Sequence, residues 1–327
     1  MGAAVAWVRL AATSGHGRPL RFPLCEPGAS VVKLVSMPLP DRRDLQEKKF
    51  QCRALSLRYV EGPANGPPLV LLHGITRDHS SFSALYPDLV ARFHIFAVDL
   101  RGHGGSGRVQ GGYRILDIAD DVAEFLTAIP APAAVFGHSL GAMVGMCAAA
   151  GHPNVAALIA GDSMITPSNL SVLYDAIFSQ LHRLLLREQS VEELASGIGR
   201  IQIHFPGIPE VIHLDEIPGN TSNNLQGWAR TAIRTDPECL RMTVDRSAYA
   251  GWNPEKILPR ITCPVLLLQA NPELDALLSD ADLALAKRLL PRAEFVKFPL
   301  LGHALFMQQP KPVLNAVIGF LDSGLKR

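Results

Sequence analysis

The chain has 327 residues, of which 48% are hydrophobic and 19% charged, and its net charge is +1. This composition is ordinary for a water-soluble enzyme, and so small a net charge gives no sign of a nucleic-acid partner or an anionic membrane partner. No apolar run reaches the about 18 residues that a membrane-spanning helix needs. The five cysteines and eleven histidines show no paired spacing, so we expect reduced thiols, a cytoplasmic location and no metal site.

The first 45 residues mix Gly, Pro, Arg and short apolar pieces without a helical or strand period. We therefore expect disorder over residues 1–45 and no catalytic role for them. Their excess of basic side chains weakly resembles an organelle-targeting extension, and Met37 is an alternative start of the protein.

Regular patterning begins at Phe50. Residues 51–60 predict an opening strand or one arm of a hairpin. Two apolar runs follow, over residues 69–72 and 94–98, and each ends in a glycine-containing loop. Such runs are typical of buried parallel strands, and ligands of parallel sheets bind at the carboxyl ends of the strands.

The second of these loops covers residues 99–107, where we expect Arg101 and His103 to brace the loop rather than to contact substrate. Residues 117–129 then predict an amphipathic helix, with acidic residues in its first turn and Pro130 after its end.

Gly137-His138-Ser139-Leu140-Gly141 is the most informative motif, because it reads Gly-x-Ser-x-Gly. An apolar run over residues 133–136 precedes it, and small apolar residues over 142–150 follow it. This strand, turn and helix context predicts a sharp turn that exposes the Ser139 hydroxyl at a helix N-terminus.

A strand is predicted again over residues 156–160, after which the strand signal disappears between Met164 and about residue 252. That segment predicts helices. Strands resume at Val265 and again over residues 293–298, just before His303, and residues 312–321 predict the last helix.

Together these pieces resemble the α/β-hydrolase superfamily, of the kind with an inserted helical cap. The matching pieces are His73-Gly74, Asp99 to Gly107, Gly137 to Gly141, Cys263-Pro264 before the strand Val265 to Leu268, and Gly302-His303. The resemblance implies a mostly parallel central sheet flanked by helices. It also implies a core over residues 46–163 and 256–327 and a helical cap over residues 164–255.

A serine hydroxyl needs a neighbouring base to become a nucleophile, and His303 has the right chemistry and position for Ser139. The resemblance implies an oxyanion hole formed by the backbone N–H groups of Leu140 and Ile75, beside Gly74.

His73 and His138 are candidate residues of the substrate pocket. His73 has an equally good interpretation as a structural residue of its loop.

The acid that would orient His303 has three candidates. Counting back about 28 residues from His303, the customary gap in the superfamily, gives Asp275, which we favour. Counting forward from the strand that ends near Leu268 gives Glu273. Asp162 is the third candidate, because some superfamily members carry the acid after the preceding strand.

These residues predict a serine hydrolase of the carboxylesterase type (EC 3.1.1). It would cleave an ester, or a related acyl bond, of a small apolar substrate through an acyl-Ser139 intermediate without a cofactor. Two alternatives remain open. One is a carbon–carbon bond hydrolase or cofactor-free perhydrolase using the same triad, and the other is a non-catalytic ligand sensor on the same fold.

Overall fold

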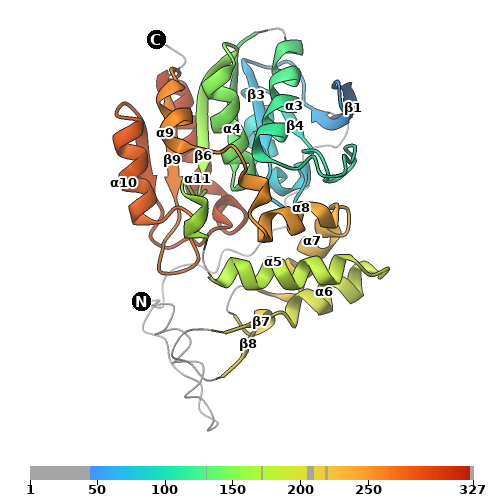
Figure 1. The fold of residues 1–327 in the computed structure, drawn as a ribbon. Helices are drawn as coiled ribbons and strands as arrows, with labels where there is room; N and C mark the ends of the chain where they lie inside the picture. The colour runs from blue at the N-terminus through green and yellow to red at the C-terminus, as the bar shows by residue number, and fades with distance from the viewer. Residues whose placement is uncertain (1–44, 130, 171, 205–209, 218–219, 325–327) are drawn as a thin grey trace, which may run out of the picture.

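The computed structural model describes the chain from residue 45 to residue 324 with four short gaps (Figure 1). The described ranges are 45–129, 131–170, 172–204, 210–217 and 220–324. We expect disorder or a targeting role for residues 1–45, with Met37 as an alternative start. Residues 1–44 lie outside the described residues.

One eight-stranded sheet within these ranges has the order β1-β2-β4-β3-β5-β6-β9-β10. β1 pairs antiparallel with β2 and β2 antiparallel with β4, whereas every later neighbour is parallel. The predicted mostly parallel sheet is thus confirmed. The strands are β1 (Gln46–Gln51), β2 (Ser56–Glu61), β3 (Pro68–Leu72), β4 (His94–Val98), β5 (Ala133–His138), β6 (Val155–Gly161), β9 (Val265–Gln269) and β10 (Glu294–Lys297).

Helices cover both faces of the sheet, because the central strands are apolar on both faces. Along β3, Leu69 and Leu71 pack in one core with α2 and α11, whereas Val70 and Leu72 pack in the other with α3, α4 and α10. Burying each such side chain contributes about 1.5–3 kcal/mol. The helices are α2 (Tyr86–Val90), α3 (Ile115–Ala128), α4 (Leu140–Gly151), α9 (Pro254–Ile257), α10 (Asp280–Leu289) and α11 (Pro310–Gly324).

Helix α3 begins two residues before its predicted start, and its first turn shows why. The Asp117 carboxylate accepts a hydrogen bond from the Arg114 backbone N–H at 3.1 Å and pairs with the Arg114 guanidinium at 2.6 Å. This contact satisfies a backbone donor at the helix end. The predicted apolar positions Ile118, Val122 and Phe125 are buried.

The chain between β6 and β9 forms a helical insertion that lies across one end of the sheet (Figure 1). The predicted limits of this cap, at residues 164 and 255, stay predictions of a domain boundary. The sequence did not predict that β7 and β8 pair antiparallel inside the insertion. Each of these strands has two residues, which is too short to show an alternating pattern. The elements are α5 (Val172–Leu185), α6 (Val191–Gly199), β7 (Gln202–Ile203), β8 (Ile212–His213), α7 (Ser222–Ala232) and α8 (Pro237–Val244).

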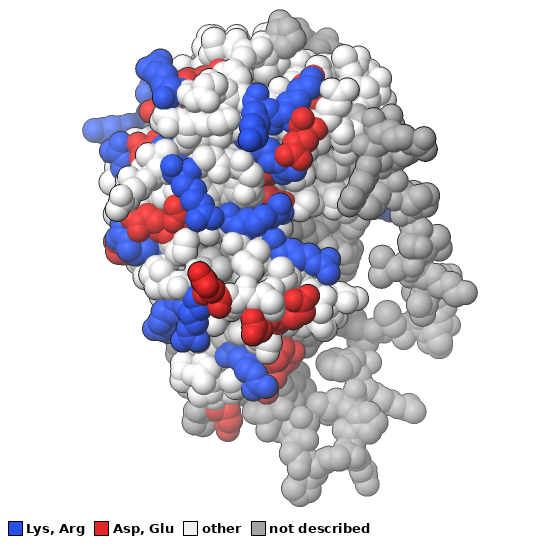
Figure 2. All heavy atoms as spheres, turned by 90° about the vertical axis from the view of Figure 1, so that its right-hand side faces the viewer, with Lys and Arg blue, Asp and Glu red and all other residues white. Residues whose placement is uncertain are grey.

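Acidic and basic side chains are interspersed on the face of the molecule that Figure 2 shows. A helix able to cross a membrane, long and apolar throughout, does not occur among the described residues. The cytoplasmic location stays a prediction.

Candidate active site

Ser139 lies in the turn between β5 and α4, in a backbone conformation that side chains rarely adopt (φ 55°). The turn closes because both flanking glycines lack a Cβ. A Cβ on Gly137 would lie 2.1 Å from the Gly141 carbonyl oxygen, and one on Gly141 would lie 2.1 Å from that of Leu72. The Ser139 side chain is therefore held at the start of α4, where unpaired backbone N–H groups favour negative charge.

The loop after β3 lies against this serine. A Cβ on Gly74 would be 3.2 Å from the Ser139 Cβ, so the loop backbone approaches the serine closely. Ile75 and Leu140, whose N–H groups are the predicted oxyanion donors, both line a cavity that Ser139 also lines. Leu140 is the first residue of α4, so its N–H has no acceptor within the helix.

His303 follows β10, and its ring contacts the carboxylate of Asp162. The His303 Nδ1 lies 2.7 Å from the Asp162 Oδ2, and the Asp162 side chain is fully buried. Asp162 also accepts hydrogen bonds from the backbone N–H groups of Ala270 (3.0 Å) and Leu277 (2.8 Å). The Ser139 N–H donates to the Gly161 carbonyl at 2.9 Å, so the serine and Asp162 lie at neighbouring strand ends.

Asp275, the favoured acid, contacts the backbone of His303 instead of its ring. The Asp275 Oδ1 accepts the His303 N–H at 2.6 Å, and burial raises the pKa of this carboxyl. The spacing argument thus found a residue that touches His303, but at a different atom. The exposed residue Glu273 donates its backbone N–H to the Asn271 side chain.

His73 and His138, the candidate pocket residues, are both buried and hold loops together. The His73 Nε2 accepts the Leu100 N–H at 2.9 Å, and its Nδ1–H donates to the Gly74 carbonyl at 2.8 Å. The His138 Nε2–H donates to the His303 carbonyl at 2.8 Å, and burial lowers the pKa of His138 to about 3. Neither is among the residues that line the cavity beside the serine, and their role in a substrate pocket stays a prediction.

Arg101 braces its loop as predicted, whereas His103 also reaches the cavity. Arg101 forms a buried, two-pronged ion pair with Asp121 at 2.5 and 2.6 Å. The His103 Nδ1–H donates to the Arg101 carbonyl at 2.9 Å, and burial lowers the pKa of His103 to about 3. His103 is therefore neutral near pH 7.

The cavity beside Ser139 is small, with a volume of about 30 Å³. That is room for about one water molecule, whereas ligand pockets usually measure about 300–1,000 Å³. Phe178 of α5 and Tyr249 close it from the side of the cap, and Tyr174 of α5 packs edge-on against the His303 ring with centroids 5.4 Å apart. We therefore expect the cap helices to shift when a substrate enters.

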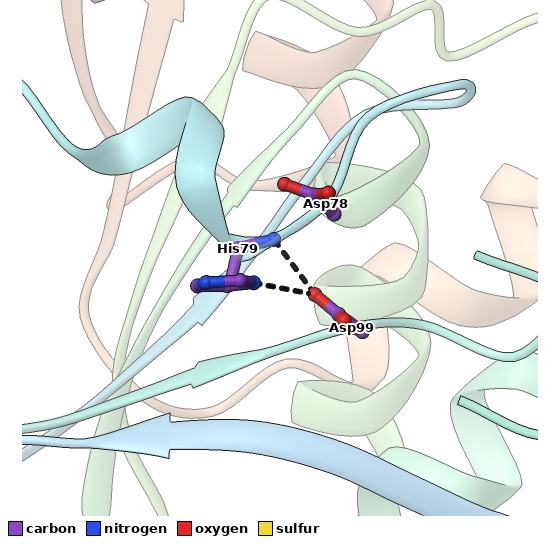
Figure 3. A group of neighbouring side chains, drawn as sticks. All are labelled: Asp78, His79 and Asp99. Atoms are coloured by element: carbon purple, nitrogen blue, oxygen red, sulfur yellow. Dashed lines mark hydrogen bonds and ion pairs between the residues drawn. The ribbon is translucent and has the colours of Figure 1, made fainter. Parts of the chain in front are cut away.

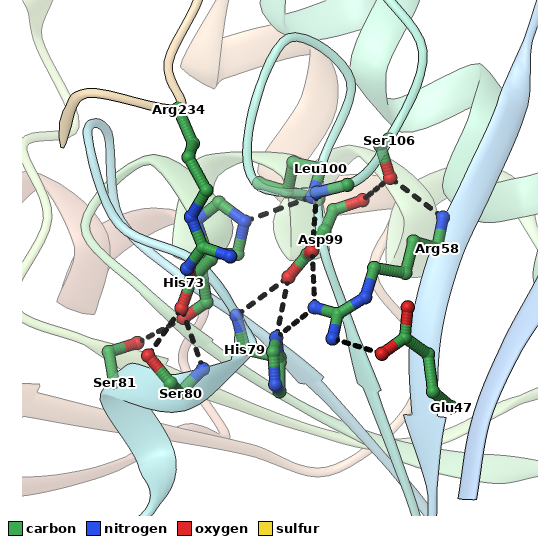
Figure 4. Close-up of polar contacts among 12 residues, drawn as sticks. Glu47, Arg58, His73, His79, Ser80, Ser81, Asp99, Leu100, Ser106 and Arg234 are labelled. Carbon is green, nitrogen blue, oxygen red and sulfur yellow. Dashed lines mark hydrogen bonds and ion pairs between the residues drawn. The ribbon is translucent and has the colours of Figure 1, made fainter. Parts of the chain in front are cut away.

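Asp78, His79 and Asp99 bring metal-ligand atoms within 4.8 Å of one another (Figure 3). Their carboxylates are already paired, however. Asp99 contacts His79 and Arg58, each at 2.9 Å, and Asp78 forms an ion pair with Arg234 (Figure 4). The cluster therefore ties loops together, with a positive charge already beside each carboxylate.

Sequence reasoning missed Arg77, which follows the Gly74-Ile75-Thr76 segment of the loop. Its guanidinium lies 5.1 Å from the ring centroid of Trp228 on α7. A single arginine in a loop is normally a solvent-exposed charge, so only the fold shows that this one faces the cap.

Comparison with known proteins gives a consistent result. The model of the alpha/beta hydrolase family matches residues 69–316. The 2-(acetamidomethylene)succinate hydrolase of Mesorhizobium japonicum is 29% identical over 269 residues, which cover 81% of this chain and 91% of that protein. A pimeloyl-[acyl-carrier protein] methyl ester esterase of Neisseria meningitidis serogroup B is 25% identical over 256 residues, covering 78% and 93% of the two chains.

Among solved structures, the crystal structure of E-2-(acetamidomethylene)succinate hydrolase matches with a TM-score of 0.66 and 26% identity. The match covers 85% of this chain and 99% of that one. The family model, which spans most of the chain, and this structural likeness agree with the fold described above. The chain belongs to the alpha/beta hydrolase family.

Proposed function

We propose that this hydrolase cleaves a carboxylic ester, or a related acyl bond, through an acyl-Ser139 intermediate. The observation that carries the proposal is the 2.7 Å contact between the His303 Nδ1 and the buried carboxylate of Asp162. A carboxylate at Nδ1 holds the proton on that nitrogen and leaves Nε2 free to act as a base.

In the first step, the Ser139 hydroxyl attacks the acyl carbon while the His303 Nε2 accepts its proton. The negative charge that forms on the acyl oxygen is stabilised by the backbone N–H groups of Leu140 and Ile75. Asp162 stabilises the positive charge on the ring. The His303 Nε2 then returns the proton to the leaving alcohol, and the bond between the acyl carbon and the leaving oxygen breaks.

In the second step, water replaces the alcohol. His303 takes a proton from the water, whose oxygen attacks the acyl carbon of the acyl-Ser139 ester. The carbon–serine bond breaks, the proton returns to the serine oxygen, and a carboxylic acid leaves. No group outside this chain, the substrate and water is needed to balance the reaction.

The relatives support an acyl substrate without fixing the bond. One is a methyl ester esterase by name, and another hydrolyses a compound that carries an acetamido group and a succinate. For this reason the proposal covers esters together with related acyl bonds.

The test is hydrolysis of p-nitrophenyl esters, from acetyl to decanoyl, by the wild type and by Ser139→Ala and His303→Ala. We expect both variants to lose about 10³-fold or more in kcat, since removing a triad member leaves only the residual catalysis of the site. The chain length with the highest kcat/KM measures the pocket that opens.

Matched controls are Ser323→Ala on the exposed face of α11 and His152→Ala at the far end of α4, neither of which should change the rate. Full activity in a folded Ser139→Ala protein would exclude the mechanism. Turnover of a vinylogous diketone but of no ester would favour the carbon–carbon hydrolase, and a ligand that raises the Tm without being consumed would favour the sensor.

A further inference from the structure

Arg77 is held between the oxyanion loop and the cap. Its backbone N–H donates to the Gly74 carbonyl at 3.2 Å, so it lies one turn after the loop segment that contacts Ser139. On the cap side, Trp228 covers the guanidinium, and the Trp228 Nε1–H also donates to the Thr76 hydroxyl at 2.8 Å. Arg77 itself thus contacts the cap through the Trp228 ring, and Trp228 is in turn bonded to the loop residue that precedes Arg77.

The guanidinium has no carboxylate partner among the described residues. Its neighbour in sequence, Asp78, is fully buried and is paired with Arg234, and it also accepts hydrogen bonds from the N–H (2.9 Å) and the hydroxyl (2.5 Å) of Ser80. Figure 4 shows the side chain of Arg234 pointing toward Ser80 and Ser81, whose hydroxyls both donate to Asp78. The negative charge closest in sequence to Arg77 is therefore hydrogen-bonded to another cation, and it acts on Arg77 only through space.

The charge of Arg77 acts on the groups that surround His303. It contributes to the lowered pKa of His138, and it opposes the rise in the pKa of Tyr174 that burial causes. Both of these side chains pack against the His303 ring, with centroids 4.8 and 5.4 Å away. Burial lowers the pKa of Arg77 itself to about 10, although the negative charge of Asp78 acts in the opposite direction.

The contact with Trp228 alone does not account for an arginine at this place. A ring face compensates part of a cation's charge but accepts none of its five N–H donors. Arg77 is half-buried, and no side-chain acceptor among the described residues bonds its guanidinium. Charges withdrawn from water are usually paired, so such a cation beside a candidate active site is typical of a group whose partner arrives with the substrate. A planar guanidinium matches a carboxylate through two parallel hydrogen bonds.

We propose that Arg77 binds a carboxylate of the substrate, so that the hydrolase acts on acyl compounds that carry a second, anionic group. This inference rests on the proposed function, since it assigns the substrate class of that same site. The apolar cavity beside Ser139 then receives the acyl carbons next to the scissile bond, while the carboxylate is held under Trp228.

The test compares two four-carbon acyl esters, mono-4-nitrophenyl succinate and 4-nitrophenyl butyrate, which differ in the terminal carboxylate. After subtraction of spontaneous hydrolysis, we expect the wild type to have the higher kcat/KM for the succinate ester. In Arg77→Met, which keeps the apolar stem, the ratio of the two kcat/KM values should fall about 10- to 100-fold, because charge-assisted hydrogen bonds are lost. For Arg77→Lys, the ratio should lie between those of the wild type and Arg77→Met. Lysine keeps the positive charge but cannot form the two parallel hydrogen bonds of a guanidinium.

Arg230→Met is the matched control, because Arg230 is an exposed arginine on the same helix as Trp228. It removes the same net charge and should leave the ratio unchanged. An equal loss on both esters in Arg77→Met would overturn the proposal and assign Arg77 to the packing of the cap. A wild type that hydrolyses both esters without preference for the charged one would overturn it as well.

Calorimetric titration with succinate separates this inference from the proposed function. We expect saturable binding to the wild type and to Ser139→Ala, and none to Arg77→Met. If neither ester is turned over but succinate binds in this pattern, the inference holds while the ester proposal fails. If esters are hydrolysed but succinate binds no better to the wild type than to Arg77→Met, the ester proposal stands and the inference is wrong.

Discussion

Two carboxylates contact His303 at different atoms, and these contacts suit them to different tasks. Asp162 meets the ring at Nδ1, where its charge would stabilise the imidazolium of the proposed mechanism. Asp275 meets the backbone N–H and so fixes the loop on which the ring is carried. A contact with the ring acts on the chemistry, whereas a contact with the backbone acts on position.

Asparagine substitutions at the two carboxylates test this assignment. Asp162→Asn removes the negative charge at Nδ1 and should lower kcat about 10³- to 10⁴-fold. Asp275→Asn keeps an oxygen that can accept the His303 N–H, so we expect a loss of less than about tenfold. Both are measured as kcat on the best p-nitrophenyl ester, with circular dichroism and Tm to show that each variant is folded.

The reverse order of the two losses would make Asp275 the acid. That outcome would require the loop after β9 to turn its carboxylate from the backbone of His303 to its ring.

Among the individual site residues, Ser139 could be predicted from a local motif, since the glycines and the serine lie within five residues. Asp162 and His303 are 141 positions apart and meet only because β6 and β9 are neighbours in the sheet and β10 follows β9. Counting along the chain measures sequence distance, so it selected Asp275. Strand order, which decides the contact, is a property of the whole sheet.

Among the elements, the long periodic ones were predictable and the loops between them were not. The central strands lie within one or two residues of their apolar runs, because burial on both faces demands continuous apolar sequence. The loops at their carboxyl ends depend on side-chain pairings such as the one that Asp99 makes at the end of β4. Residue spacing does not predict such pairings.

Asp99 joins three elements through one buried carboxylate. It contacts Arg58 of β2, both the backbone and the ring of His79, and the N–H of Gly105, each at 2.9 Å. Burial alone would raise the pKa of Asp99, but the hydrogen bonds and the charge of His79 outweigh it and hold the pKa well below its ordinary value. The charged form is therefore the one that stabilises this corner of the fold.

We expect Asp99→Asn to lower the free energy of unfolding by about 3 kcal/mol at pH 7, since it leaves Arg58 and the loop donors with a weaker acceptor. The folded-state pKa is depressed, so this contribution is present above the unfolded value of about 3.9 and is lost as the pH falls below it. Urea unfolding from pH 3 to pH 8 should show the difference between wild type and variant shrinking below about pH 4.

The control for Asp99→Asn is Asp322→Asn, which removes an acid of an exposed ion pair (3.8 Å) and should change stability by less than about 0.5 kcal/mol at any pH. A difference between wild type and Asp99→Asn that stays constant down to pH 3 would contradict a depressed pKa.

On the scale of the whole molecule, the cap and the core are joined by polar contacts that cross between them. Trp228 bonds to Thr76, Arg234 pairs with Asp78, and the backbone N–H of Asp236 donates to the Gly102 carbonyl at 2.7 Å. Each joins residues more than a hundred positions apart, so none could be predicted from local pattern. These contacts also decide which charges at the site are compensated.

Arg234 affects the electrostatic potential at Arg77, because it neutralises the charge of Asp78. In Arg234→Met, the fully buried carboxylate of Asp78 loses its cation and stands beside Arg77, where it repels an incoming substrate carboxylate. We expect the ratio of kcat/KM for mono-4-nitrophenyl succinate over 4-nitrophenyl butyrate to fall about tenfold, and the Tm to fall as well.

The double variant Asp78→Asn with Arg234→Met removes both charges and should restore the ratio, because Arg77 then again faces the substrate without a competing anion. The Tm need not recover with it, since the cap has still lost its contact with the loop. A ratio that falls in Arg234→Met and stays low in the double variant would mean that Arg234, rather than the charge of Asp78, acts on the substrate. If the ratio is unchanged in both Arg234→Met and the double variant, the charges of Asp78 and Arg234 do not act on the bound carboxylate. The proposed anion site therefore depends on three charges. The core supplies Arg77 and Asp78, and the cap supplies Arg234, which neutralises Asp78 so that Arg77 can bind the substrate carboxylate.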